Sequence, residues 1–376
     1  MATTANQDQD NTNIGKPNAQ PTVAVVYTRP NTVIEDVERA MLLANYQSHL
    51  PKTHSTLLKI NISWQHYYPA CSTTPWQLEG VIKTLRKNNY GELIPAHNGT
   101  VVVDPIEGAL QNKHKSVEDK YGLQSVYLDS PPSKWIPYTP KSKMLVLNDI
   151  FPEGFEIPDI FEGKNIIHLP TMKTHVFTTI TGAMKNAFGG LLNRKRHWTH
   201  SVIHETLVDL LNIQKELHPG LFAVTDGTFA GDGPGPRAMR WHEKNVLLAG
   251  ADQVAIDAVS ATMMGFDAMS IKFIRLAHEA GLGCGDINNI NVVGENIDGI
   301  NWGFKSNQNT LASRGQKLIY WGPLKPLENM LLRSPIAPWA FLASNIYHNG
   351  YWLPFIGRSR VRAAMQTGWG KLFQSY

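Results

Sequence analysis

Short apolar runs alternate with amphipathic stretches along most of the chain. The runs at residues 22–27, 57–61 and 165–168 are rich in β-branched and other apolar residues, which is typical of buried strands. Between such runs, apolar residues recur at the spacing of one helix face. The further predicted strands are 92–96, 125–128, 144–147, 221–225, 246–249 and 290–293, and the predicted helices are 31–46, 75–85, 106–121, 201–217, 252–264 and 271–280.

This alternation indicates βαβ units, and therefore an α/β fold with a mostly parallel sheet and helices on both faces. We expect an α/β domain over residues 21–303, either as one body or as two lobes that meet near residues 150–165. Residues 1–20 are polar and are expected to form a disordered leader. From residue 304 the alternation ends, and residues 304–376 are expected to form an extension of short helices and turns.

Composition narrows the class of protein. Hydrophobic residues make up 42% of the chain and charged residues 18%, as in ordinary globular proteins. Two cysteines, Cys71 and Cys284, are too few for a disulfide framework or a four-thiolate cluster, and they suit a reducing compartment. No apolar run reaches the ~18 residues of a membrane-spanning helix, and no secretory signal begins the chain. We expect a cytoplasmic protein, or a peripheral one on the cytoplasmic side of a membrane.

Positive charge is concentrated at the C-terminal end. The net charge is +4, but from Arg314 onward eight basic residues accompany only Glu328. Residues 341–356 are rich in aromatic and apolar side chains, and Arg358, Arg360 and Arg362 follow them. Such a composition favours contact between residues 320–376 and an anionic membrane surface, which would make a lipid-like substrate plausible. Alternatively, the same surface packs on the domain or on a second copy in a homo-oligomer.

The main candidate chemistry follows the strand predicted at residues 165–168. Lys173 and His175 are two residues apart, so they face the same side if the backbone is extended. Lys185 is expected near the start of a helix, whose N-terminal amides favour an anion. Two ammonium groups and an imidazole suit a site that holds a carboxylate or phosphate and moves a proton. Alternatively, His175 is a packed histidine and the lysines are solvated.

Acidic and glycine residues later in the chain are further candidates. Asp226 follows a predicted strand, where its carboxylate can orient a lysine, act as a base or shape a turn. Asp257 lies among apolar residues and therefore needs a partner, for which a site lysine is a candidate. Gly231 and Gly233 allow the backbone to approach a ligand closely.

These segments resemble a bacterial and archaeal family named as a domain of unknown function. The matching motifs, in family order, are Lys59-Ile-Asn61, Lys173-Thr-His175, Thr181-Gly-Ala-Met-Lys185-Asn186 with Gly189, Asp226-Gly227 with Gly231-Asp-Gly-Pro234, and Asp252-Gln-Val-Ala-Ile-Asp257. Ile60 stands where the family has proline. Many relatives carry a ferredoxin-like module; this chain does not, so no 4Fe-4S cluster is expected.

A more distant similarity is to the lactate racemases that use a nickel-pincer cofactor. The similarity implies His175 as acid or base, Lys185 as the anchor of the cofactor, and His200 as a metal ligand. The glycine pair that precedes the lysine in that family is missing here. A cluster of His197, His200 and His204 lacks the glutamate of a His-Glu-x-x-His zinc site.

The basic run at residues 194–200 is weak evidence for nucleic acid, and none is expected as a partner. A loop that closes over an anionic substrate and an exposed charged loop are the alternatives.

The resulting hypothesis is an isomerase-like or epimerase-like enzyme that acts on a small anion. The proton would move through His175, with Lys173 and Lys185 holding the anion and Asp226 or Asp257 setting their charge. The predicted substrate-binding residues are Lys59, Asn61, Asn186, Gly231, Gly233 and Asp257. Two alternatives stay open: an oxidoreductase or redox partner, as the iron–sulfur-fused relatives imply, and a non-catalytic protein that binds a membrane surface.

Overall fold

The structure is a computed structural model that describes residues 20–99, 103–333 and 338–376. The leader predicted at residues 1–20 lies outside the described residues except for Gln20.

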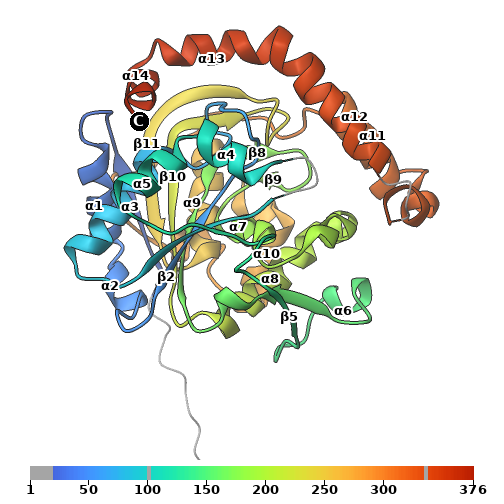
Figure 1. The fold of residues 1–376 in the computed structure, drawn as a ribbon, viewed down its shortest axis with the longest axis horizontal. Coiled ribbons are helices and arrows are strands. Elements are labelled where there is room, and N and C mark those ends of the chain that lie inside the picture. Colours follow the sequence, from blue (N-terminus) through green and yellow to red (C-terminus); the bar gives the residue numbers. More distant parts are fainter. Residues whose placement is uncertain (1–19, 100–102, 334–337) are drawn as a thin grey trace, which may run out of the picture.

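A twisted central sheet forms the middle layer of the domain (Figure 1). Its strands, in spatial order, are β12 (Asn291–Gly294), β1 (Thr22–Tyr27), β11 (Arg240–Gly250), β10 (Leu221–Asp232), β7 (Asn165–Leu169), β2 (Thr56–Ile60), β3 (Leu93–His97) and β4 (Val126–Tyr127). Within this order only β11 runs antiparallel to its neighbours. A mostly parallel sheet is thereby confirmed.

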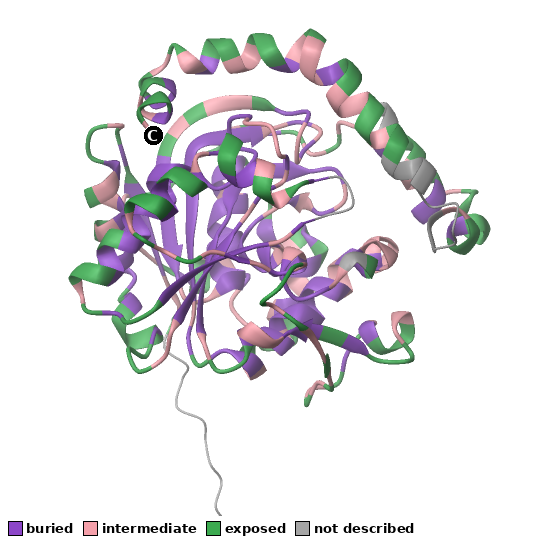
Figure 2. Cartoon of the chain, viewed as in Figure 1, coloured by how far each residue is buried: buried purple, intermediate pink, exposed green. Residues whose placement is uncertain are grey.

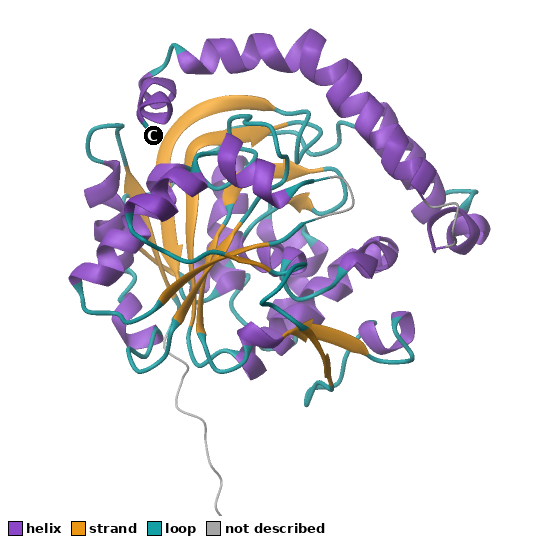
Figure 3. Ribbon diagram, in the orientation of Figure 1, coloured by secondary structure: helices purple, strands orange, loops and turns teal. Residues whose placement is uncertain are grey.

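Helices cover both faces of this sheet, as predicted (Figure 3). One face packs against α7 (Ala183–Asn186), α8 (Ile203–Leu217), α9 (Gln253–Met264) and α10 (Lys272–Glu279). The other packs against α1 (Val33–Leu43), α3 (Pro75–Lys87) and α14 (Gly368–Ser375). Most of the strands between these layers are buried (Figure 2), which explains their continuous apolar runs, whereas β12 and the first half of β11 are partly exposed.

The strand predicted at residues 144–147 is wrong. These residues lead into a short helix, α6 (Leu147–Ile150). The reason is the buried carboxylate of Asp209, which accepts hydrogen bonds from the backbone N–H groups of Leu145, Val146 and Leu147. The Asp209 side chain on α8 thus supplies the hydrogen-bond acceptors that a neighbouring strand would supply if this run were a strand.

Two other segments differ from the expected pattern. The helix predicted at 106–121 is divided into α4 (Pro105–Gln111) and α5 (His114–Lys120), because Lys113 between them is left-handed, with φ 65°. The hairpin of β5 (Trp135–Tyr138) and β6 (Phe155–Pro158) lies outside the main sheet and was not predicted.

The C-terminal extension consists of helices, as expected. It contains α11 (Leu311–Tyr320), α12 (Pro338–Asn345), the π-helix η8 (Ile346–Gly357), α13 (Arg358–Met365) and α14. From α12 to α13 these helices form a curved arm along one side of the domain, and α14 returns to the core (Figure 1). None of the helices in the described ranges is both long and apolar enough to span a bilayer.

Candidate functional site

A small polar cavity lies where β2 and β7 reach their carboxyl ends, the usual position of ligand sites in parallel sheets. The chain continues there from β7 through Pro170 into β8 (Thr171–His175), which pairs with the far half of β10. The cavity measures about 60 Å³ and is lined by Asn61, Ser63, Pro170, Lys173, Thr181, Gly182, Lys185, Asn186 and Pro236. Two lysines, two amides and two hydroxyls therefore face one space, and no carboxylate is among its lining residues.

Lys173 is held firmly in the cavity wall. Its Nζ donates to the carbonyl oxygen of Cys71 at 2.7 Å and to Oγ1 of Thr171 at 2.8 Å. The side chain is 1% exposed, and burial lowers the pKa of its amine to about 8. No carboxylate pairs with this amine among the described residues. Lys173 is thus a fixed cation with a lowered pKa, and an incoming anion would stabilise its charge.

Lys185 faces the same cavity from α7 but is held differently. Its Nζ lies 5.2 Å from the centre of the Phe188 ring, and within the described ranges it has no hydrogen-bond acceptor and no ion-pair partner. Burial, with the nearby charges of Lys173 and Arg196, lowers the pKa of Lys185 to about 7. An amine that titrates near neutral pH is able both to accept and to donate a proton.

Asp257 positions the segment that carries Lys185. Its carboxylate, on α9, accepts from the backbone N–H groups of Ala183 at 2.6 Å and Met184 at 3.1 Å. Burial raises the pKa of Asp257 to about 8 although both bonds favour the carboxylate. Two expectations are corrected here. The partner of Asp257 is backbone rather than a lysine, and these N–H groups of α7 already bond a carboxylate instead of a ligand anion.

His175 lies beside the cavity and is absent from its lining. Nδ1 of the ring accepts from the backbone N–H groups of Phe177 at 3.2 Å and Thr178 at 3.4 Å, which places the ring proton of the neutral form on Nε2. Burial, then the charges of Lys185 and His200, hold the pKa of His175 well below 6.5. A neutral imidazole with so low a pKa is a weak base, so the geometry favours Lys185 as the group that moves a proton.

The two predicted asparagines both line the cavity and also brace it. Nδ2 of Asn186 donates to the carbonyl oxygen of Lys59 at 2.8 Å and lies 3.2 Å from Nδ1 of His168. Nδ2 of Asn61 donates to the carbonyl oxygen of Cys71, which is also the acceptor for Lys173. The amides therefore tie the ends of β2 and β7 to the segment of Lys185.

Lys59 lies behind the wall rather than on it. Its Nζ donates to Oδ1 of Asn98 at 2.8 Å and to the carbonyl oxygen of Ile60 at 2.6 Å. The side chain is 1% exposed, and burial together with Arg196 lowers its pKa to about 7. Lys59 adds positive potential near the site without lining the cavity.

Asp226 is bonded to the start of α3, away from both site lysines. Oδ2 accepts from the hydroxyl of Thr74 and from Nε1 of Trp76 at 3.0 Å, while Oδ1 accepts from the backbone N–H of Thr228 at 2.6 Å. Both oxygens of the carboxylate thus accept hydrogen bonds, and Asp226 links β10 to the start of α3. Its proposed action on the charge of the lysines has no contact to support it.

Gly231 and Gly233 support β8 instead of lining the cavity. Their carbonyl oxygens both accept from Oγ1 of Thr174, at 3.4 and 2.7 Å. A Cβ atom on Gly231 would lie 2.5 Å from Sδ of Met239 and 3.1 Å from Cβ of Lys173. The glycine thus permits the close packing of β10 on the strand that carries Lys173.

His200 does not belong to a metal-binding group in the part of the chain that the structure describes, where no three His, Cys, Asp or Glu side chains come together to hold an ion. Nδ1 of His200 lies 3.0 Å from the carbonyl oxygen of His197, and its ring stacks on Tyr320. Burial lowers its pKa to about 3. The ring packs among Phe177, Phe188 and Tyr320, so the metal-ligand role stays a prediction without geometric support.

Comparison with known proteins places the chain in a family. The family described as a domain of unknown function, DUF362, matches residues 56–262, more than half of the chain. The chain belongs to the DUF362 family. All nine residues that line the cavity, and Asp257 that positions it, lie inside the DUF362 match. The membership expected from the motifs is confirmed at the level of the family, whereas the similarity to lactate racemases stays a prediction.

One relative also matches a part of the chain. A thylakoid-associated protein of Synechocystis sp. is 29% identical over 131 residues, which cover 33% of this DUF362 chain and 40% of that protein. The aligned part is thus less than half of the relative's length. No solved structure matches the chain at a significant level.

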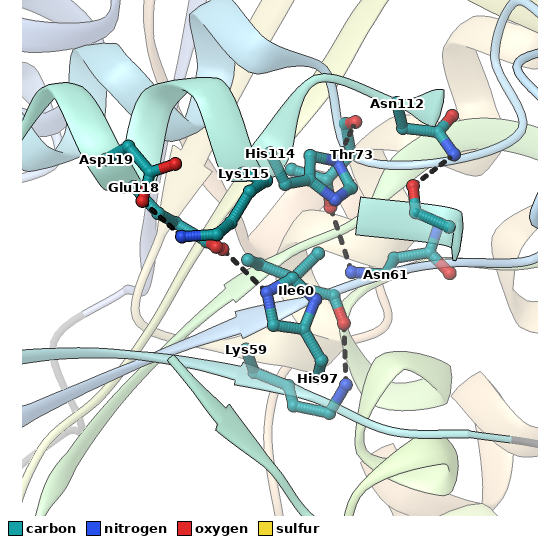
Figure 4. Close-up of polar contacts among 11 residues, drawn as sticks. Lys59, Ile60, Asn61, Thr73, His97, Asn112, His114, Lys115, Glu118 and Asp119 are labelled. Carbon is teal, nitrogen blue, oxygen red and sulfur yellow. Dashed lines mark hydrogen bonds and ion pairs between the residues drawn. The ribbon is translucent and has the colours of Figure 1, made fainter. Parts of the chain in front are cut away.

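A second polar cluster of the DUF362 domain was missed from the sequence (Figure 4). His97, at the end of β3, pairs through Nε2 with Glu118 at 2.6 Å, and both side chains are fully buried. The adjacent His114 bonds the carbonyl oxygen of Thr73 at 2.7 Å, and Oγ1 of Thr73 accepts from the backbone N–H of Asn61. The cluster therefore supports the loop after β2 from behind.

Several residues that line the cavity were not identified from the sequence motifs. Ser63 and Pro236 lie outside every motif, and they come together because Nε of Arg237 donates to the carbonyl oxygen of Ser63 at 2.8 Å. Thr181 and Gly182 belong to the Thr-Gly pair that precedes Lys185, and this pair was the available signal for them.

Proposed function

We propose that the DUF362 domain of this protein is an enzyme that binds a small anion and exchanges a proton with it through Lys185. The observation that carries the proposal is that two lysine amines face one cavity whose lining residues include no carboxylate. A cavity of about 60 Å³ is small beside the roughly 300–1,000 Å³ of pockets that enclose drug-sized ligands. It suits a carboxylate or phosphate group with few further atoms.

The two lysine amines would have different roles, one in binding the anion and the other in proton transfer. Lys173, fixed by two acceptors, would hold the anion in place. Lys185, without an acceptor among the described residues, would act as base and acid. In the fraction of bound protein whose Lys185 amine is unprotonated, that amine would take a proton from the carbon beside a carboxylate and become an ammonium group. The electron pair would pass into an enolate stabilised by Lys173, and return of the proton would regenerate the amine.

The site also predicts how binding depends on pH. In the free protein the pKa is about 7 for Lys185 and about 8 for Lys173, and a bound anion raises both values. Binding is therefore strongest below pH 7 and weakens as the pH rises through 7 and 8. At pH 8 it must take up protons from the solution.

Calorimetry tests the binding step. Inorganic phosphate and a panel of small carboxylates, including lactate, are titrated at pH 8 in buffers that differ in ionisation enthalpy. The expected result is uptake of protons by the wild type and a smaller uptake by Lys185→Met. Lys215→Met, which changes an exposed lysine on α8, is the matched control and should behave as wild type.

Proton NMR in D₂O tests the chemical step. Each carboxylate that binds is incubated with the protein, and deuterium entry at the carbon beside the carboxylate is followed. We expect exchange that Lys185→Met abolishes and His175→Gln retains in part. Exchange that persists in Lys185→Met would refute the role of Lys185, and binding without any exchange would leave an anion-binding protein. Because the Synechocystis relative is named for its association with thylakoids, the panel should include carboxylates and phosphates with a short acyl chain.

A further inference from the structure

The curved arm exposes a row of large apolar side chains on its outer face. Leu342 and Phe355 are 62% and 74% exposed, and Ile346 and Tyr351 between them are 61% and 53% exposed. Large apolar side chains are usually buried on folding, so a row of four at these exposures is a candidate binding surface.

The π-helical geometry of η8 explains why these residues share a face. An i→i+5 hydrogen-bond pattern places side chains four and five positions apart above one another. Ile346, Tyr351 and Phe355 follow that spacing, and the rings of Tyr351 and Phe355 lie 5.6 Å apart. Leu342 extends the row by one turn of α12. In a regular α-helix Ile346 and Phe355 would point in opposite directions.

The inner face of the same helix is anchored to the domain. Trp352 is 4% exposed and packs against Trp64 and Tyr68, with ring centres 6.0 and 5.3 Å apart. Nε1 of Trp64 donates to Oδ1 of Asn349 at 2.8 Å. The outer row is therefore held in place, because Trp352 on the same helix is buried in the domain and Tyr347, Leu353 and Ile356 pack around it.

Basic residues adjoin the apolar row. Residues 338–376 contain Arg358, Arg360, Arg362 and Lys371 and no acidic residue. Arg358 and Arg362 are exposed, one turn apart on α13, and pair with no carboxylate in the described part of the chain. Arg360 differs, since it donates to the carbonyl oxygen of Met239 at 2.6 Å and so fastens the arm. An anionic surface would complement these two exposed cations.

We propose that the row Leu342, Ile346, Tyr351 and Phe355, with Arg358 and Arg362, docks this protein on the surface of a membrane that contains anionic lipid. Aromatic and aliphatic side chains enter the interface between head groups and acyl chains, and adjacent arginines bind the head groups. A second copy fits less well. A two-fold contact uses the same surface on both copies, and residues 338–376 offer no acidic residue that could pair with these arginines.

Sedimentation of the full-length protein with vesicles tests the proposal. Vesicles of phosphatidylcholine alone are compared with vesicles that also contain phosphatidylserine, at low and high salt. The wild type should bind the anionic vesicles, and less so as salt rises. Replacing two exposed rings, Tyr351→Ser with Phe355→Ser, should lower the partition coefficient by roughly tenfold or more. Arg358→Gln with Arg362→Gln should weaken binding and remove its dependence on salt.

Controls separate this result from misfolding and from self-association. Ile106→Ser with Leu110→Ser changes a comparably exposed apolar pair on α4 and should bind as wild type. Thermal unfolding of each variant checks the fold. Equal vesicle binding by wild type and the Tyr351/Phe355 variant would overturn the proposal, and so would absence of binding. A dimer in analytical ultracentrifugation that this variant dissociates, without vesicle binding, would assign the row to a second copy.

Discussion

A Cβ atom on Gly182 would lie 2.2 Å from Oδ1 of Asp257, closer than any real contact allows. The carboxylate occupies this place because it accepts the N–H groups of Ala183 and Met184 that follow the glycine. Gly182 itself has φ 141°, a backbone conformation that side chains rarely adopt. The absence of a side chain at Gly182 thus allows Asp257 to bond the start of α7. These contacts together place Lys185 at the cavity.

Gly182→Ala is expected to disrupt the contact between Asp257 and the start of α7 and to destabilise the protein. The new methyl group must displace the carboxylate, and the backbone strain alone costs about 1–3 kcal/mol of unfolding free energy. Urea denaturation followed by circular dichroism measures the loss. Gly91→Ala is the control, because no atom lies within 4 Å of the added Cβ there and its φ is not in the positive range. Equal urea midpoints for Gly182→Ala and wild type would contradict the steric argument.

The buried amine of Lys185 should lower the free energy of unfolding of the protein. Its pKa is about 7 in the folded protein and about 10.4 in an unfolded chain, so the folded state disfavours the charged amine. The penalty is complete below pH 7, where both states are protonated. It declines as the pH rises from 7 towards 10.4 and is absent above that value. Lys185→Met should therefore stabilise the protein, by on the order of 5 kcal/mol below pH 7.

The measurement is the urea midpoint of wild type and Lys185→Met at pH 6 and pH 9. The gain should be larger at pH 6, and Lys215→Met should show no such dependence. A variant that is inactive yet more stable would mark Lys185 as a functional residue, since a structural lysine stabilises its own site. A Lys185→Met protein less stable than wild type at pH 6 would disprove the buried charge.

The sequence motifs identified about half of the cavity wall. Lys173, Lys185, Asn61 and Asn186 were predicted and line the cavity, because polar residues after apolar strands end at one edge of a parallel sheet. Asp257 was recognised as a buried carboxylate in need of a partner. A lysine and a pair of backbone N–H groups satisfy a carboxylate equally, so a sequence cannot decide between them.

Residues 144–147 show the same difficulty for the fold. Met144, Leu145, Val146 and Leu147 form an apolar run that resembles a buried strand. The pattern does not register Asp209, which lies more than sixty positions later on α8 and accepts three backbone N–H groups of the run. The apolar side chains are still needed, since Leu147 is fully buried, but a turn rather than a strand places them.

Asp209→Asn is expected to weaken the hydrogen bonds that hold this turn and to destabilise the protein. An amide offers one oxygen in place of two, and its NH₂ group faces an N–H donor, so at least one buried N–H loses its acceptor. Such a loss costs about 1–3 kcal/mol. Urea denaturation measures the cost, and hydrogen exchange at Leu145, Val146 and Leu147 locates it. Asp267→Asn, at an exposed N-cap where asparagine serves as well as aspartate, is the control and should change neither. Unchanged exchange at all three amides in Asp209→Asn would show that the run is held by its apolar side chains alone.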